Sequence, residues 1–262
     1  MNYLQVIENK KPLFKRGSIL DKEILENMIK TPYEYYSLEY YEYSDGVICG
    51  VTTFVENNLL IVTPGIIKYN NYHYKIGENI ILEIPKEDGE YILKIKFIPP
   101  TETDRGKYLR HAMQFFFTVN SEQENMELEL VRIKRREGAE VKNPEIFEEI
   151  DKEYNLINEI NRKQSTASGA SFPEKLLKMF AKKVLETKDS EIVDEIFCYS
   201  VLNSRISRDA LNIYFFKKFK IDTKEYSNQE IYILLKKILF NLKDSKYVKN
   251  SNIVRKNRMM VE

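Results

Sequence analysis

The chain has 262 residues, of which 43% are hydrophobic and 31% are charged, a composition typical of globular proteins. Its 41 Lys and Arg residues nearly balance its 40 Asp and Glu residues, which argues against a chain built chiefly to neutralise nucleic acid. No apolar run reaches the roughly 18–20 residues of a membrane-spanning helix, and the first residues lack the features of a signal peptide. We therefore expect a protein assembled in a reducing cytoplasm, with Cys49 and Cys198 not joined in a disulfide.

Residues 1–140 predict a β-rich domain that contains one short helix near its beginning. Ser18 suits the N-cap of this helix, with an acidic residue three positions later, and Thr31-Pro32 is expected to end it. The tyrosine-rich segment 35–43 follows, and its partial alternation predicts a strand with aromatic faces.

Two pairs of apolar runs, each joined through asparagines, predict consecutive β-hairpins. The first pair is Val47–Val55 and Leu59–Val62, and the second is Ile66–Tyr69 and Tyr72–Ile76. Between the pairs, Pro64-Gly65 predicts a turn in which the glycine takes a positive φ.

Four further strands are expected, and the lysines of the second should face outward from a half-buried sheet. They cover 79–84, 90–98, 113–119 and 126–133. So many short strands within about 130 residues favour a compact antiparallel sandwich or barrel.

The pattern changes after Gly138 to one typical of helices. Residues 141–162 predict a connecting amphipathic helix that starts at Asn143-Pro144. Its apolar residues recur every three or four positions: Ile146, Ile150, Tyr154, Ile157 and Ile160. The Ser-, Ala- and Gly-rich residues 163–172 predict a linker.

Residues 173–242 predict a small helical bundle of four short helices. A capping box at Ser171–Glu174 opens the first helix. The next two helices are expected over about 189–203 and 207–219. A second capping box, Ser227–Glu230, opens the last helix, expected over about 228–242. Residues 243–262, with six Lys or Arg and two acidic residues, are expected to form a flexible basic tail. The predicted fold class is α+β, an N-terminal antiparallel β-sandwich or barrel-like domain followed by a small C-terminal helical bundle.

No catalytic, cofactor-binding or metal-binding residue is predicted. His73 and His111 lack a further ligand at metal-binding spacing, and the chain contains no phosphate-binding glycine loop or nucleophile elbow. The polar loop Asp104–Lys107, beside Arg110-His111, offers groups for a phosphate, but a solvated loop accounts for it at least as well. We expect no enzyme, no cofactor and no small-molecule substrate.

The basic cluster Arg132, Lys134, Arg135 and Arg136, with the basic tail, supports an alternative: a nucleic-acid-binding accessory or regulatory protein. The aromatic residues of segment 35–43 would then stack on bases. Against this alternative, an acidic segment directly follows the cluster, and aromatic residues are also enriched at protein–protein interfaces. Nucleic acid is therefore the less favoured partner.

The segments Gly46–Gly50 and Thr63–Tyr69 resemble a small β-domain of bacterial prophage tail modules, found near the baseplate or tail-fibre junction. Further segments are similar to proteins of clostridial-type contractile phage tails and phage-tail-like bacteriocins: Leu4–Ile7, Lys11–Phe14, Glu127–Leu130 and Glu137–Ala139. The resemblance covers roughly residues 1–140 and carries no functional residue with it. Some similar proteins are labelled helicases, but the chain contains no nucleotide-binding loop to match.

This resemblance implies a non-enzymatic structural component of a contractile phage-tail or tailocin baseplate. Such a protein would link the baseplate to neighbouring or receptor-binding subunits, so its expected partners are other baseplate or tail proteins, including a tail-fibre protein. The expected location is the bacterial cytoplasm during assembly and then the phage-tail-like particle.

Overall fold

The computed structural model describes residues 17, 19, 21–103, 108–122, 124–152, 154–187, 190–221 and 224–242. The chain divides into two compact units, Met1–Glu42 and Tyr43–Glu262, which are described separately below. The elements in chain order are α1 (Lys22–Glu39), β1 (Gly46–Gly50), β2 (Thr53–Glu56), β3 (Leu59–Val62), β4 (Gly65–Tyr69), β5 (Tyr72–Ile76), β6 (Ile80–Glu83), β7 (Gly89–Thr103), β8 (Tyr108–Thr118), β9 (Glu127–Arg135), the 3₁₀ turn η1 (Phe147–Glu149), β10 (Ile157–Asn158), β11 (Gln164–Thr166), β12 (Gly169–Ser171), α2 (Glu174–Leu185), α3 (Ile192–Asn203) and α4 (Arg208–Phe219). Residues 228–242 form one more helix.

The first unit is built on α1, which is longer than the sequence predicts. Asp21 caps the helix, since its carboxylate accepts a hydrogen bond from the backbone N–H of Ile24 at 2.8 Å; the cap predicted at Ser18 lies outside the described residues. The helix continues through Pro32 to Glu39, so the predicted stop and the predicted strand over 35–43 are both wrong. The tyrosines of this segment also fit a helix, because those four residues apart lie on one face.

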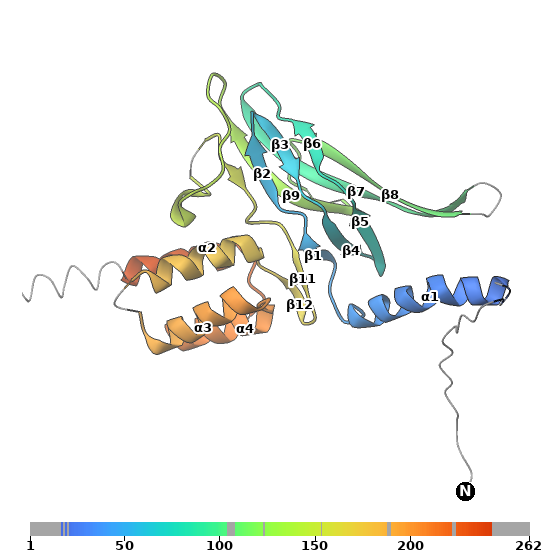
Figure 1. The fold of residues 1–262 in the computed structure, drawn as a ribbon. Helices are drawn as coiled ribbons and strands as arrows, with labels where there is room; N and C mark the ends of the chain where they lie inside the picture. The colour runs from blue at the N-terminus through green and yellow to red at the C-terminus, as the bar shows by residue number, and fades with distance from the viewer. Residues whose placement is uncertain are drawn as a thin grey trace, which may run out of the picture. The chain divides into compact units, whose positions relative to one another are not determined.

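The second unit contains three sheets, visible in Figure 1, with strand orders β12-β11-β1-β4-β5, β10-β9-β7-β8 and β2-β3-β6. Among the described strand pairs only β1 and β11 run parallel; the others are antiparallel. One hydrophobic core draws on all three sheets, with Val47, Leu60 and Leu93 among its buried members. The fold is α+β with the sheets preceding the helices, as predicted.

Paired asparagines make the two predicted hairpins. Asn57 and Asn58 have φ of 50° and 61°, and Asn70 and Asn71 have φ of 48° and 62°. Positive φ at both central residues is the requirement of a type I′ turn, which matches the twist of the flanking strands. The pairs β2–β3 and β4–β5 are therefore in the predicted places.

The run Val47–Val55 forms two strands in different sheets instead of one. The chain bends between them at Gly50 and Val51, whose φ values are 63° and 50°. Gly65 is not among the glycines with positive φ, so the predicted turn conformation at Pro64-Gly65 is wrong. A Cβ on Gly65 would lie 2.3 Å from the carbonyl oxygen of Cys49, so the glycine is needed for close approach of two chain segments.

Strands β7 and β8 form a hairpin longer than predicted, passing Pro99-Pro100 with an irregularity between Ile98 and Thr101 (Figure 1). Lys94 of β7 does not face outward as predicted. It is 2% exposed, and its ammonium lies 3.1 Å from the carboxylate of Glu127. A buried lysine needs such an opposite charge, and the alternation of β7 does not reveal it.

The amphipathic helix predicted over 141–162 is wrong. Its described residues contain only the short turn η1 and the two-residue strand β10, and Asn155 with φ of 55° is not helical. Its apolar residues serve two cores, because Ile157 packs among the strands. Three others pack among the helices: Phe147, Ile150 and Ile160. Two other residues of the predicted apolar face, Ile146 and Tyr154, are 45% and 55% exposed, so the spacing marks no single buried face.

Residues 163–172 are not a linker, because they contain the hairpin β11–β12. All three residues of β11 are buried, and the side chain of Gln164 donates to the carbonyl of Val47 at 2.8 Å. Ser165 donates to the carbonyl of Ser44 at 2.5 Å. Small polar residues thus form a hydrogen-bonded strand that extends the sheet beside β1.

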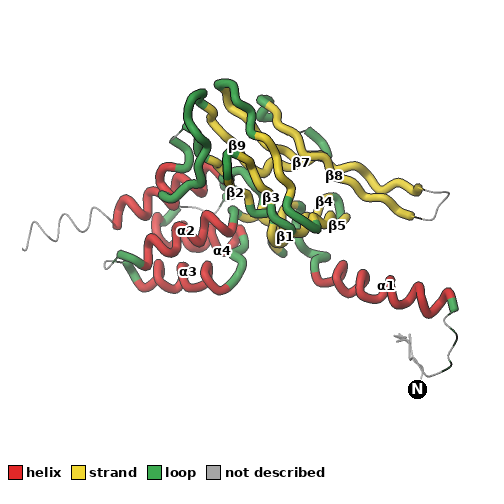
Figure 2. The backbone as a smooth tube through the Cα atoms, turned by 45° about the horizontal axis from the view of Figure 1, so that its top comes forward, coloured by secondary structure: helices red, strands yellow, loops and turns green. Residues whose placement is uncertain are grey.

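The C-terminal helices lie together in Figure 2 and enclose a second core that includes Phe180, Phe215 and Tyr232. Their positions agree with prediction. The capping box Ser227–Glu230 is confirmed, since the Ser227 hydroxyl accepts from the Glu230 N–H at 3.2 Å and the Glu230 carboxylate accepts from the Ser227 N–H at 2.8 Å. The box predicted at Ser171 is wrong, because that hydroxyl donates to the carbonyl of Ile206. The tail 243–262 lies outside the described residues.

Candidate functional site

The helix α1 exposes an apolar face along its whole length. No residue of α1 is buried, and Leu25, Ile29 and Tyr33 are 46%, 77% and 54% exposed. Their four-residue spacing puts them on one side of the helix. The exposed ion pair Lys30–Glu34, at 3.4 Å, lies on the other side, whereas the ion pair Lys22–Glu26, also at 3.4 Å, borders the apolar residues. An amphipathic helix normally turns its apolar side to a core, and the first unit provides no core for this one, since no residue of α1 is buried.

The isolated helix is also costly to maintain. It has 18 residues and holds Pro32 in its interior, where proline removes one backbone hydrogen bond at about 3 kcal/mol or more. Helices near this length are marginal in water even with favourable sequences. Burial of a Leu, Ile or Met side chain returns about 1.5–3 kcal/mol. Covering Leu25, Met28 and Ile29 against a partner would therefore outweigh the cost of Pro32.

A second apolar face lies on α3 and α4 in the second unit. Ile192, Ile196 and Tyr199 of α3 are exposed, at the spacing of one helix face. The opposite side of α3 is buried in the helical core through Phe197, Cys198 and Val201. Since α3 is apolar on both sides, its outer side suits contact with another protein. On α4, Ile213 and Phe216 are exposed as well.

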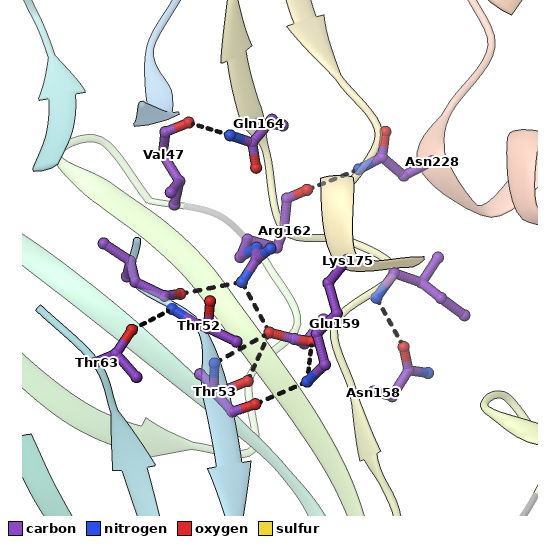
Figure 3. A network of polar contacts seen from close by, with 12 residues as sticks. Val47, Thr52, Thr53, Thr63, Asn158, Glu159, Arg162, Gln164, Lys175 and Asn228 are labelled. Carbon is purple, nitrogen blue, oxygen red and sulfur yellow. Dashed lines mark hydrogen bonds and ion pairs between the residues drawn. The ribbon is translucent and has the colours of Figure 1, made fainter. Parts of the chain in front are cut away.

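A buried polar network connects the strands with the helices within the second unit (Figure 3). We call it the junction network and define it as Thr53, Glu159, Arg162 and Lys175. The Glu159 carboxylate is 1% exposed and accepts from the Thr53 hydroxyl at 2.7 Å and from the Arg162 guanidinium at 2.8 Å. Its other oxygen lies 2.8 Å from the Lys175 ammonium.

Two side chains of the junction network also donate hydrogen bonds to backbone carbonyls. Arg162 donates to the carbonyl of Val51 at 3.0 Å, and Lys175, at the start of α2, donates to the carbonyl of Thr53 at 2.8 Å. Burial on its own raises the pKa of Glu159, but Arg162, Lys175 and the hydrogen bonds hold the pKa below its ordinary value. Glu159 is thus an ionised carboxylate with one oxygen hydrogen-bonded to Thr53 and Arg162 and the other in an ion pair with Lys175.

A pocket of about 440 Å³ opens beside α2 and the junction network; we call it the α2 pocket. Its wall carries four cationic side chains and one carboxylate, which pairs with Lys178 at 2.5 Å. The lining residues are Cys49, Gly50, Thr52, Arg162, Gln164, Glu174, Lys175, Lys178, Met179 and Lys182. Lysines 175, 178 and 182 recur every three or four residues along the sequence, a signal that the sequence analysis missed.

The two histidines lie on strands, His111 beside aromatic rings and His73 partly buried. His111 of β8 lies against Tyr72 and Tyr74 of β5, with ring centroids 5.4 and 6.0 Å apart. Burial, and then Lys68, lower the pKa of His73. In the part of the chain that the structure describes, no three His, Cys, Asp or Glu side chains gather as metal ligands. The loop Asp104–Lys107 lies outside that part.

Two residues of the basic cluster, Arg132 and Arg135, are engaged within the protein. Arg132 makes a two-point contact with Glu129, with N–O distances of 2.6 and 2.9 Å. Arg135 is buried and donates to Asn155 at 2.8 Å, and Arg136 stacks over the ring of Tyr154. Lys134 and Arg136 are exposed, so two of the four basic side chains remain at the surface. Tyr35 and Tyr36 lie in the helix α1, so the predicted strand with aromatic faces does not supply the stacking platform of the nucleic-acid alternative.

Among the described residues, none of the helices has the length and apolar character needed to cross a bilayer. No protein-family model matches the chain, and no curated protein matches it.

The solved structures that are similar to the chain include two from the type VI secretion system. A crystal structure of TssK is 8% identical with a TM-score of 0.33, and the match covers 90% of this chain and 69% of that one. A cryo-electron microscopy structure of the type VI secretion system TssK-TssF-TssG baseplate subcomplex is 10% identical with a TM-score of 0.38, covering 91% of this chain and all of that one. Matches at these scores do not establish a common fold, so the function is argued from this chain's own residues.

Proposed function

We propose that the chain is a non-enzymatic structural component that joins protein subunits in the baseplate of a contractile phage tail or tailocin. The observation that carries the joining role is α1, which buries none of its residues and exposes a continuous apolar face. Large assemblies commonly use such helices, which lay their apolar side into a hydrophobic groove of the neighbour. The partner would be another baseplate or tail protein, and a tail-fibre protein is a further candidate.

The baseplate assignment is supported by the resemblance of Gly46–Gly50 and Thr63–Tyr69 to prophage tail modules. Assembly would take place in the bacterial cytoplasm before incorporation into the particle. On this proposal the β-rich residues 1–140 and the helical residues 173–242 are separate working parts, with no catalytic, cofactor-binding or metal-binding residue in either. The junction network would keep the second unit rigid when neighbouring subunits bind to its surfaces.

Incorporation into purified particles tests the proposal. We would substitute Ile29→Asp on the apolar side of α1 and use Glu34→Gln on the polar side as the matched control. Because α1 buries nothing within the chain, Ile29→Asp should leave thermal unfolding unchanged but reduce the chain's amount in intact baseplates at least tenfold. Equal incorporation of both variants would contradict the docking role of α1, and absence of the unaltered chain from well-formed baseplates would contradict the function itself.

A further inference from the structure

We propose that the α2 pocket binds an acidic segment of a neighbouring subunit, whose Asp or Glu carboxylates face Arg162, Lys178 and Lys182. This inference rests on the proposed function, because it supplies a second contact for the same assembly. It concerns a different surface from α1, so the two can fail separately.

Charge is the first argument. The pocket wall holds Arg162, Lys175, Lys178 and Lys182 against the single carboxylate of Glu174. Lys175 is committed to Glu159 and Lys178 to Glu174. Lys182 has no carboxylate partner within the described chain. The wall therefore keeps a surplus of positive charge, which attracts a carboxylate-bearing ligand.

The second argument is an unused donor in the pocket wall. The Arg162 side chain is 3% exposed, and its Nη1 is hydrogen-bonded to Val51 and Glu159. Its Nε–H, in contrast, has no acceptor in the described structure. A buried donor without an acceptor is unfavourable. A ligand oxygen that reached Nε from the pocket, which Arg162 lines, would satisfy it.

The size and lining of the pocket favour a peptide over a small inorganic anion. A volume of about 440 Å³ lies within the range of small-ligand pockets and accommodates a few side chains, but not a folded element. Met179 and Gly50 give the wall an apolar part that suits the methylene groups of glutamate. The cations are spread along α2 instead of converging on one point, as a single phosphate would require.

Cys49 provides the assay, because it lines the pocket while Cys198 is fully buried. We would measure the rate at which uncharged iodoacetamide alkylates Cys49 in the full chain, with tetraglutamate peptide or tetraglutamine as the control. Tetraglutamate should slow the reaction in a saturable manner that weakens with salt. Lys182→Gln should raise the half-saturating concentration about two- to fivefold, the range of an exposed ion pair. Lys183→Gln, the adjacent lysine outside the pocket, should leave it unchanged.

Equal effects of the two peptides, or of the two lysine variants, would overturn the proposal. Protection by inorganic phosphate under conditions where tetraglutamate gives none would overturn it in favour of an anion site. Circular dichroism of each variant checks that the fold is kept, which the exposure of both lysines leads us to expect. If tetraglutamate does not protect Cys49 but the chain still enters baseplates through α1, this inference is wrong and the proposed function still holds.

Discussion

Glu159→Gln should destabilise the second unit strongly, although the substitution keeps the size and shape of the side chain. The amide can still accept from Thr53, but it no longer neutralises Arg162, whose side chain is 3% exposed, or Lys175 at 2.8 Å. Removing one partner of a buried ion pair costs about 3–5 kcal/mol, because the remaining charge stays buried. For a protein of about this size, each kcal/mol shifts the unfolding midpoint by about 2–4 °C, so we expect a loss of about 10 °C.

The assay is urea unfolding followed by far-UV circular dichroism, since the chain contains no tryptophan to report by fluorescence. The urea midpoint should fall with the slope unchanged, which indicates a loss of stability without a change in compactness. Glu186→Gln is the matched control, because its ion pair with Lys183 is long, at 3.9 Å, and Glu186 is 70% exposed; it should cost no more than about 0.5 kcal/mol. A cost below about 1 kcal/mol for Glu159→Gln would refute the structural role of the junction network.

Three further predictions concern pH, a buried hydrogen bond and a turn. The native pKa of Glu159 is lowered, so the contribution of Glu159 to stability is complete above its unfolded-state pKa and is lost as pH falls. The difference in unfolding free energy between the wild type and Glu159→Gln should therefore stay constant from pH 7 to about 5 and narrow below about pH 4.5. A difference that widens in acid would contradict this assignment. Tyr214→Phe removes the 2.7 Å hydrogen bond to the fully buried Asp194 and should cost about 1–3 kcal/mol in urea unfolding, whereas an unchanged midpoint would mean that Lys218 alone satisfies the carboxylate. Asn58→Val should cost about 1–2 kcal/mol because a β-branched residue tolerates φ of 61° poorly, while Asn58→Gly should be neutral or slightly stabilising; equal melting temperatures for these two variants would argue against the type I′ turn.

Local structure could be predicted from the sequence where neighbouring residues determine the backbone conformation. The asparagine pairs at 57–58 and 70–71 specify type I′ turns without help from the rest of the chain. The box Ser227–Glu230 likewise closes through its own side chains. The exposed Glu230 carboxylate, held mainly by Lys224 and then by Ser227, has its pKa lowered to about 2. These elements were predicted correctly for that reason.

Elements that depend on distant partners were predicted wrongly. The Ser- and Gly-rich residues 163–172 have the composition of a linker, yet a parallel pairing with β1, more than 110 residues earlier, makes them a strand. The spacing within 141–162 indicates a helix until Ile157 and Ile160 are seen to enter different cores. Nothing local distinguishes these cases, because the decisive contacts lie far away in sequence.

The candidate surfaces were only partly foreseeable. The apolar and aromatic residues of α1 were noted in the sequence, but the strand assigned to 35–43 divided the helix and concealed its continuous face. The α2 pocket could not be predicted, since it combines lysines of one helix with Arg162 and Cys49 from segments that only the fold brings together.

Site-specific photo-cross-linking in purified particles tests the central claim, that α1 is seated on another subunit, most directly. A photoreactive residue at position 29, on the exposed apolar face, is compared with one at position 34, on the polar face. We predict that position 29 forms a covalent product with one other baseplate or tail subunit, and that position 34 gives little or none. Intact particles in which neither position cross-links to another chain would contradict the account.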